Sequence, residues 1–134
     1  MNIKILILHH NTPEVTKRLC EAVPEAIVID NGSDPSKRLK VKNQIIQLDK
    51  NYGFTIGWNK GMQAVGKADA YWLMNSDIEI DRRSVERIKE AAANKELDIF
   101  TPAYNCFIKQ CQPNYVKEPT VLGAIEFTAP VIMG

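Results

Sequence analysis

The chain has 134 residues, with 17 Lys and Arg against 16 Asp and Glu, which gives a formal net charge of +1 at pH 7. This length fits one domain, or one piece of a larger one, and is short for a two-domain enzyme. A charge so close to zero provides no broad positive field. We therefore expect no nucleic-acid partner, and any anionic ligand must be held by local groups.

Cysteine content and hydropathy bound the cellular setting. The three cysteines form no CxxC pair and no zinc-like spacing, and their odd number argues against a disulfide framework, which favours a cytoplasmic location. No apolar run reaches the roughly 18 residues of a membrane span. The N-terminal apolar stretch also lacks the length and cleavage site of a signal peptide. We expect a soluble chain with no transmembrane segment.

Short apolar runs alternate with helical patterns along the chain. The run from Ile3 to Leu8 is β-branched and nearly continuous, which is typical of a strand buried on both faces of a parallel sheet. Asn11-Thr12-Pro13 offers a capping residue and a proline for the start of the first helix, Gly66 suits the end of the second, and Asp81 suits the N-cap of the third. In chain order, the pattern predicts a strand at 3–8, a helix at 14–22, strands at 26–29 and 44–48, a helix at 53–65, a strand at 70–74 and a helix at 82–94.

This alternation predicts an α/β fold with a mostly parallel central sheet between helices. We treat residues 1–134 as a single domain, in which residues 1–97 hold the regular βα repeats and residues 98–134 are less regular. In the less regular part we expect a strand at 98–101, a hairpin and loop at 102–119, and one or two strands at 121–133.

Polar residues follow each of the first four expected strands. In an open α/β sheet the strand carboxyl ends and the loops that leave them form the ligand crevice. Any one of these clusters is more typical of a turn than of a site, but their recurrence at every strand end favours a crevice. In strand order the clusters are His9, His10 and Asn11; Asp30 and Asn31; Asn51, Tyr52 and Gly53; and Asn75, Ser76 and Asp77.

Individual residues of these clusters admit two interpretations. Asp30 could accept a hydrogen bond from a base or a ribose, or it could close a turn with the residues that follow it. Asp77 could hold Mg2+ or Mn2+, since a carboxylate is a hard oxygen ligand, or it could simply end a strand. His9 and His10 are adjacent on a strand and point to opposite faces, so at most one of them faces a ligand.

Three glycines recur at every fourth position of the second expected helix. Gly53, Gly57 and Gly61 share one helical face, which would let the helix approach the sheet closely and bring its N-terminus near an anion. There is no GxGxxG motif and no Walker loop, so a dinucleotide-binding or P-loop enzyme is disfavoured. A flavodoxin-like or nucleotidyltransferase domain has no supporting motif either.

Taken together, three motifs resemble glycosyltransferase family 2, particularly its rhamnosyltransferase-like members. They are residues 27–34 (Ile-Val-Ile-Asp-Asn-Gly-Ser-Asp), residues 51–54 (Asn-Tyr-Gly-Phe) with Asn59 and Gly61, and residues 73–77 (Leu-Met-Asn-Ser-Asp). The likeness is clear over about residues 1 to 94. It implies a GT-A fold, a three-layer sandwich whose Rossmann-like half binds a nucleoside diphosphate sugar. The implied reaction is inverting transfer of the glycosyl group to a hydroxyl of a saccharide or another acceptor.

The resemblance also implies roles for residues of this chain. It gives Asp77 the divalent cation, Mg2+ or Mn2+, while Asn75 replaces the commoner first Asp of that motif and His9 and His10 replace the usual Thr-Tyr pair. The nucleotide-sugar site that it implies consists of His10, Asn11, Asp30, Asn31, Gly53, Asn59, Ser76 and Asp77.

The catalytic base is not assigned from the sequence. In the family an Asp or Glu of the acceptor-binding part takes the proton from the acceptor hydroxyl, and we expect that residue beyond Gly134. Glu126 precedes the end of its expected strand, which favours a structural role. A second hypothesis is therefore a non-catalytic nucleotide-sugar-binding or interaction module that lacks the acceptor half.

Overall fold

The computed structural model describes residues 1–93, 99–101 and 114–116, and the chain divides into two compact units, Met1–Glu86 and Arg87–Gly134. In the second unit, β5 (Ile99–Thr101) pairs antiparallel with β6 (Asn114–Val116). The strand expected at 98–101 is thus confirmed. Glu126 and the strands expected at 121–133 lie outside the described residues, and the single-domain interpretation stays a prediction.

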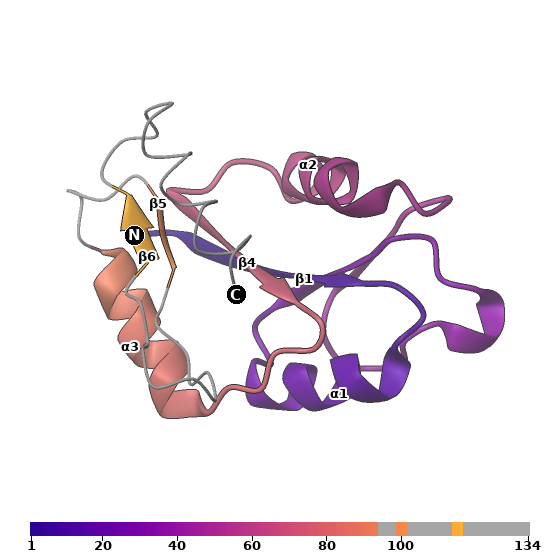
Figure 1. Ribbon diagram of the computed structural model, residues 1–134, viewed down its shortest axis with the longest axis horizontal. Coiled ribbons are helices and arrows are strands. Elements are labelled where there is room, and N and C mark those ends of the chain that lie inside the picture. The colour runs from indigo at the N-terminus through magenta and orange to yellow at the C-terminus, as the bar shows by residue number, and fades with distance from the viewer. Residues whose placement is uncertain (94–98, 102–113, 117–134) are drawn as a thin grey trace, which may run out of the picture. The chain divides into compact units, whose positions relative to one another are not determined.

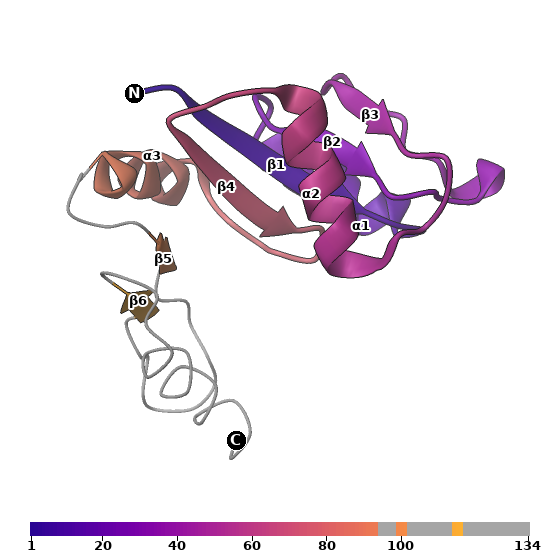
Figure 2. The ribbon, with the colours of Figure 1, turned by 90° about the horizontal axis from the view of Figure 1, so that it is seen from above.

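The first unit is built on a parallel sheet of four strands in the order β3-β2-β1-β4. The central strand β1 pairs with β2 on one side and with β4 on the other, and β3 extends the sheet beyond β2 (Figure 2). All four strands were predicted, and each strand end lies within one residue of the prediction. They are β1 (Ile3–His9), β2 (Ile27–Asp30), β3 (Ile45–Gln47) and β4 (Ala70–Asn75).

Helices cover both faces of this sheet. Helix α1 (Pro13–Ala22) lies on one face and α2 (Gly53–Val65) on the other (Figure 1). Helix α1 begins at Pro13, and Thr12 occupies its N-cap position as the Asn11-Thr12-Pro13 segment suggested. The Thr12 side chain makes no capping hydrogen bond. Helix α2 has the predicted bounds, and Gly66 ends it with a φ of 70°. A short 3-10 helix, η1 (Pro35–Lys37), follows β2.

Side chains of β1 alternate between the two helical layers. Ile5 and Ile7 are buried in a core with Leu19 of α1 and Val28 of β2, because residues two apart on a strand share a face. This core also contains Cys20, Val23, Ala26, Leu39, Met74 and Val85. The apolar run that predicted a strand buried on both faces is therefore explained by a helix on each side.

Helix α2 packs closely against the sheet at two of its three glycines. A Cβ atom placed on Gly61 would lie 2.7 Å from Ile29 Cγ1, and one placed on Gly57 would lie 3.2 Å from Leu8 Cδ1. A Cβ on Gly53 would meet nothing within 4 Å. The close-packing prediction is thus confirmed for Gly57 and Gly61 and wrong for Gly53.

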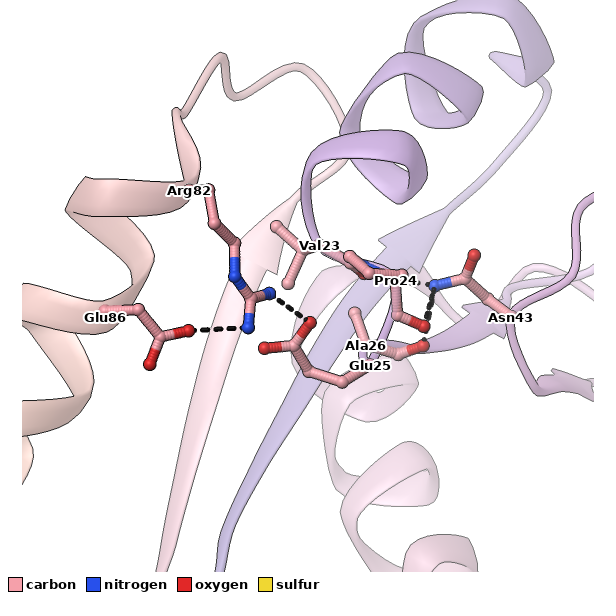
Figure 3. Close-up of polar contacts among 7 residues, drawn as sticks. All are labelled: Val23, Pro24, Glu25, Ala26, Asn43, Arg82 and Glu86. Atoms are coloured by element: carbon pink, nitrogen blue, oxygen red, sulfur yellow. Dashed lines mark hydrogen bonds and ion pairs between the residues drawn. The ribbon is translucent and has the colours of Figure 1, made fainter.

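Figure 3 shows how polar side chains hold the connection between α1 and β2. Asn43 donates from Nδ2 to the carbonyl oxygens of Val23, Pro24 and Ala26, at 3.2, 3.2 and 3.0 Å. On the other side of this loop, Glu25 forms an ion pair of 2.6 Å with Arg82, the first residue of α3 (Arg82–Ala92). The connection is therefore fixed from both sides.

The start of α3 follows the prediction. The Asp81 carboxylate accepts a hydrogen bond from the backbone N–H of Ser84 at 2.8 Å, which confirms Asp81 as the N-cap. That bond is the main reason why the pKa of Asp81 lies below its usual value. None of the helices in the described part of the chain is long and apolar enough to cross a membrane.

Candidate functional site

The loops that leave the four parallel strands are linked to one another by hydrogen bonds. The His9 carbonyl accepts the backbone N–H of Asn31, and the Asp30 carbonyl accepts that of Leu48, both at 2.8 Å. The hydroxyls of Thr12 and Ser76 lie 3.3 Å apart, which joins the loop after β1 to the loop after β4. The polar strand ends therefore meet along one edge of the sheet.

Asp30 lies at the bottom of this edge with its side chain fully buried. Its Oδ1 accepts the backbone N–H of Ser33 at 2.8 Å, which is the turn-closing role. Its Oδ2 is also buried but has no hydrogen-bond partner in the described part of the chain. A buried acceptor without a donor is costly, typically by about 1–3 kcal/mol. The two interpretations of Asp30 are thus compatible, because one oxygen serves the turn and the other is left for a donor.

Asn31 is also buried, but all its hydrogen-bonding groups are used within the protein. Its Nδ2 donates to Asn51 Oδ1 at 3.1 Å and to the Gly53 carbonyl at 3.0 Å. Its Oδ1 accepts the backbone N–H of Tyr52 at 3.1 Å. Asn31 therefore holds the loop between β3 and α2 in place, a task that the sequence pattern did not reveal.

The two histidines lie in different surroundings. His9 is fully buried next to Asp30, its register partner on β2, and its Nδ1 lies 2.8 Å from Thr16 Oγ1 on α1. Burial lowers the pKa of His9 below its usual value, and the nearby Asp30 carboxylate partly opposes this effect. His10 is half-buried, and its Nδ1 has no partner among the described residues.

Asn11 joins the loops after β1 and β2. Its backbone N–H donates to Ser33 Oγ at 3.0 Å, and its side chain exchanges hydrogen bonds with Asp34. Asn11 adopts a φ of 57°, a left-handed conformation that Asn tolerates better than most residues. The conformation turns the chain sharply between His10 and the start of α1.

At the end of β4, Asp77 and Asn75 are exposed and Ser76 is half-buried. No group of three or more His, Cys, Asp or Glu side chains suited to a metal ion occurs in the described residues. Mg2+ is commonly bound by one or two carboxylates together with substrate phosphates and water. Asp77 therefore fits a cation that is shared with a diphosphate, but not one held by protein side chains alone.

Near the start of α2, two lysine side chains lie close to an aromatic ring. The Nζ atoms of Lys50 and Lys60 lie 5.1 and 4.3 Å from the ring centre of Tyr52, whose hydroxyl donates to Asp49 at 2.8 Å. Sequence reasoning identified Tyr52 in a strand-end cluster but missed both lysines. Gly53 and Asn59 of the same region are exposed.

A parallel sheet with helices on both faces and polar loops at its strand carboxyl ends defines a Rossmann-like α/β domain. The model of Glycosyl transferase family 2 matches residues 9–121. The chain belongs to this family, and its parallel sheet with flanking helices is consistent with the Rossmann-like half of a GT-A fold. No curated protein matches the chain significantly.

The matched range includes all eight residues of the predicted nucleotide-sugar site. The match supports a glycosyltransferase-like domain, and members of the family commonly use divalent cations. The rhamnosyltransferase-like subtype stays a prediction.

Proposed function

We propose that the first unit binds the nucleoside diphosphate of a sugar donor along the strand carboxyl ends. The glycosyl group is then transferred with inversion to an acceptor hydroxyl. Family membership supports the reaction class. The observation that carries the binding site is the buried Oδ2 of Asp30, which lies without a donor at the edge where ligands of open α/β sheets bind.

The nucleobase occupies the end of the site near Asp30. A ring N–H of the base donates to Asp30 Oδ2, which relieves the cost of leaving that oxygen buried and unpaired. His10 lies in the preceding loop and offers a half-buried aromatic ring to the base. Asn31 acts indirectly, because its amide holds the loop that begins α2.

The diphosphate occupies the other end, near Ser76 and Asp77. When it is bound, a divalent cation supplies positive charge that stabilises the departing diphosphate. Asp77 holds the cation through its exposed carboxylate, and Ser76 lies beside it at hydrogen-bonding distance from Thr12. We assign no catalytic base.

Binding of UDP or dTDP to the full chain tests this proposal. With Mg2+ or Mn2+ and a nucleotide at about 100 times its Kd, the free energy of unfolding should rise by roughly 2.7 kcal/mol, visible as a thermal shift. We expect Asp77→Asn to unfold like the parent without ligand, because the side chain is exposed, but to lose the metal-dependent part of the shift.

Glu79→Gln is the matched control for Asp77→Asn, since it removes the same charge from an exposed position two residues away. It should keep the full metal-dependent shift. Equal shifts for Asp77→Asn and the parent would contradict the metal assignment, and the absence of any shift with either nucleotide would contradict the donor site.

Asp30→Asn separates the two ends of the site. The substitution replaces an unpaired acceptor with an amide, so the base loses its acceptor, while the groups around Ser76 and Asp77 are unchanged. We expect the UDP affinity to fall by about 10-fold or more, in line with the 1.5–3 kcal/mol of a hydrogen bond to a charged group. Titration with inorganic pyrophosphate and Mg2+ at alkaline pH, where His9 is neutral in both proteins, should give the parent affinity. A parallel loss for pyrophosphate would show that Asp30 does not act through the base.

A further inference from the structure

A chain of hydroxyl groups runs from His9 to Ser76. His9 Nδ1 lies 2.8 Å from Thr16 Oγ1, Thr16 Oγ1 lies 3.4 Å from Thr12 Oγ1, and Thr12 Oγ1 lies 3.3 Å from Ser76 Oγ. His9 stands beside Asp30 on the neighbouring strand. These hydroxyl groups therefore connect the two ends of the proposed donor site, and the role inferred for them rests on that proposed function.

The imidazole of His9 can keep its hydrogen bonds whether it is neutral or protonated. Its Nε2 lies 3.4 Å from the Lys37 carbonyl, which can only accept, so Nε2 carries the hydrogen in both states. Neutral Nδ1 accepts from the Thr16 hydroxyl. When Nδ1 is protonated it donates to Thr16 Oγ1, and the Thr16 hydroxyl can turn to Thr12 instead, where it can donate to the carbonyl oxygen at 2.9 Å or to Oγ1 at 3.4 Å. The proton can thus bind without leaving a buried group unpaired.

The direction of the hydroxyl chain follows the charge of His9. With neutral His9, Thr16 donates to the imidazole, Thr12 donates to Thr16, and Ser76 donates to Thr12. When His9 is protonated and the Thr16 hydroxyl donates to Thr12 Oγ1, each donor turns around, so Thr12 donates to Ser76 and the Ser76 hydrogen becomes available to a ligand. An anionic diphosphate favours this second arrangement, because it accepts hydrogen bonds and cannot donate them.

Among the charged groups around His9, the one that stabilises its protonated form has a larger effect than the one that opposes it. Asp30 on β2 stabilises the imidazolium, whereas His10 on the same strand opposes it. On α1, Cys20 stays a neutral thiol, because burial raises its pKa to about 11. Burial keeps the pKa of free His9 below its usual value, so the imidazole is neutral above that range and ready to accept a proton when an anion arrives.

We propose that His9 is a proton-linked positioning residue of the donor site, which acts through Thr16 and Thr12 on the hydroxyl that Ser76 presents to the diphosphate. Binding then raises the pKa of His9 above its value in the free protein. The additional affinity is absent above the pKa of the bound form, appears as the pH falls through it, and is complete below the pKa of the free form.

The test is a pH titration of the full chain with UDP and Mg2+. The chain has only two histidines, so a spectrum of His10→Asn assigns the remaining imidazole signals to His9. We expect NMR to give a His9 pKa about one unit higher in the complex, and calorimetry to give a Kd roughly 10-fold lower at acid than at alkaline pH. The β-phosphate of UDP titrates near pH 6 itself, but comparison of variants with the parent cancels that effect.

Three variants isolate the chain of hydroxyls. His9→Asn retains a polar group near Thr16 but cannot titrate, so only the pH dependence that comes from UDP itself should remain. If this variant does not fold, Thr12→Val still tests the proposal at an exposed position, since it should remove the dependence that comes from His9 and Thr12→Ser should restore it. Thr12→Val with the pH dependence of the parent, or an equal His9 pKa in the free and bound parent, would overturn the proposal. Absence of UDP binding at every pH would overturn the donor site itself.

Discussion

Replacement of Gly32 by alanine should lower the free energy of unfolding by more than about 3 kcal/mol. Gly32 has a φ of 68°, where a residue with a Cβ atom loses roughly 1–2 kcal/mol. The added Cβ would also overlap main-chain atoms of Lys50 and Asn51 and would lie 2.5 Å from Lys50 Cα. Such overpacking costs about 1–3 kcal/mol or more, and backbone atoms cannot rotate away as a side chain could.

Gly66→Ala is the matched control, because Gly66 has a similar φ of 70° but a Cβ there would meet no atom within 4 Å. It should show only the conformational cost, about 1–3 kcal/mol. Urea unfolding of both variants measures the difference. If Gly32→Ala and Gly66→Ala lost the same stability, the contact between the loop after β2 and the loop after β3 would not be as close as the structure has it.

The sequence predicted the elements around these glycines more reliably than their contacts. Periodicity sets the limits of a helix locally, which is why α2 ends at Gly66 as expected. The approach of Gly32 to Lys50 joins residues from two loops, and no spacing along the chain encodes it. The close approach of Gly57 and Gly61 was predicted because they share a helical face. The prediction failed for Gly53, which is the first residue of α2 and has no atom within 4 Å of an added Cβ.

The candidate site, too, could be predicted from the sequence only in part. Topology alone brings the carboxyl ends of parallel strands to one edge, so the clusters after β1, β2 and β4 could be expected to meet. The pattern could not show that Asp30 uses one oxygen for its turn and leaves the other unpaired, or that His9 faces Thr16. Those choices depend on the distances between side chains of separate elements, which are fixed only when the sheet and α1 pack together.

Asn31→Asp should destabilise the protein by about 3–5 kcal/mol at neutral pH, the range found when a buried charge loses its partner. Only 3% of Asn31 is exposed, and its Nδ2 donates to Asn51 Oδ1 and to the Gly53 carbonyl at 3.1 and 3.0 Å. Aspartate has the same shape but would place a negatively charged oxygen against these two acceptors. The loop that begins α2 would keep only the hydrogen bond from the Tyr52 N–H to Oδ1 and would lose the two that Nδ2 donates.

The pH dependence of this variant distinguishes charge repulsion from a loss of packing. Burial among acceptors raises the pKa of the introduced carboxyl in the folded state above about 3.9, its value in the unfolded chain. The unfolded state then binds fewer protons than the folded state between these two pKa values, so the penalty is full at neutral pH and shrinks as the pH falls through the folded pKa. Asn59→Asp, the same change at an exposed position of α2, should stay within about 0.5 kcal/mol of the parent. Urea unfolding at several pH values measures this effect. The difference in the free energy of unfolding between Asn31→Asp and Asn59→Asp should become smaller as the pH falls from 7 to 4. A difference that does not change with pH would assign the loss to packing.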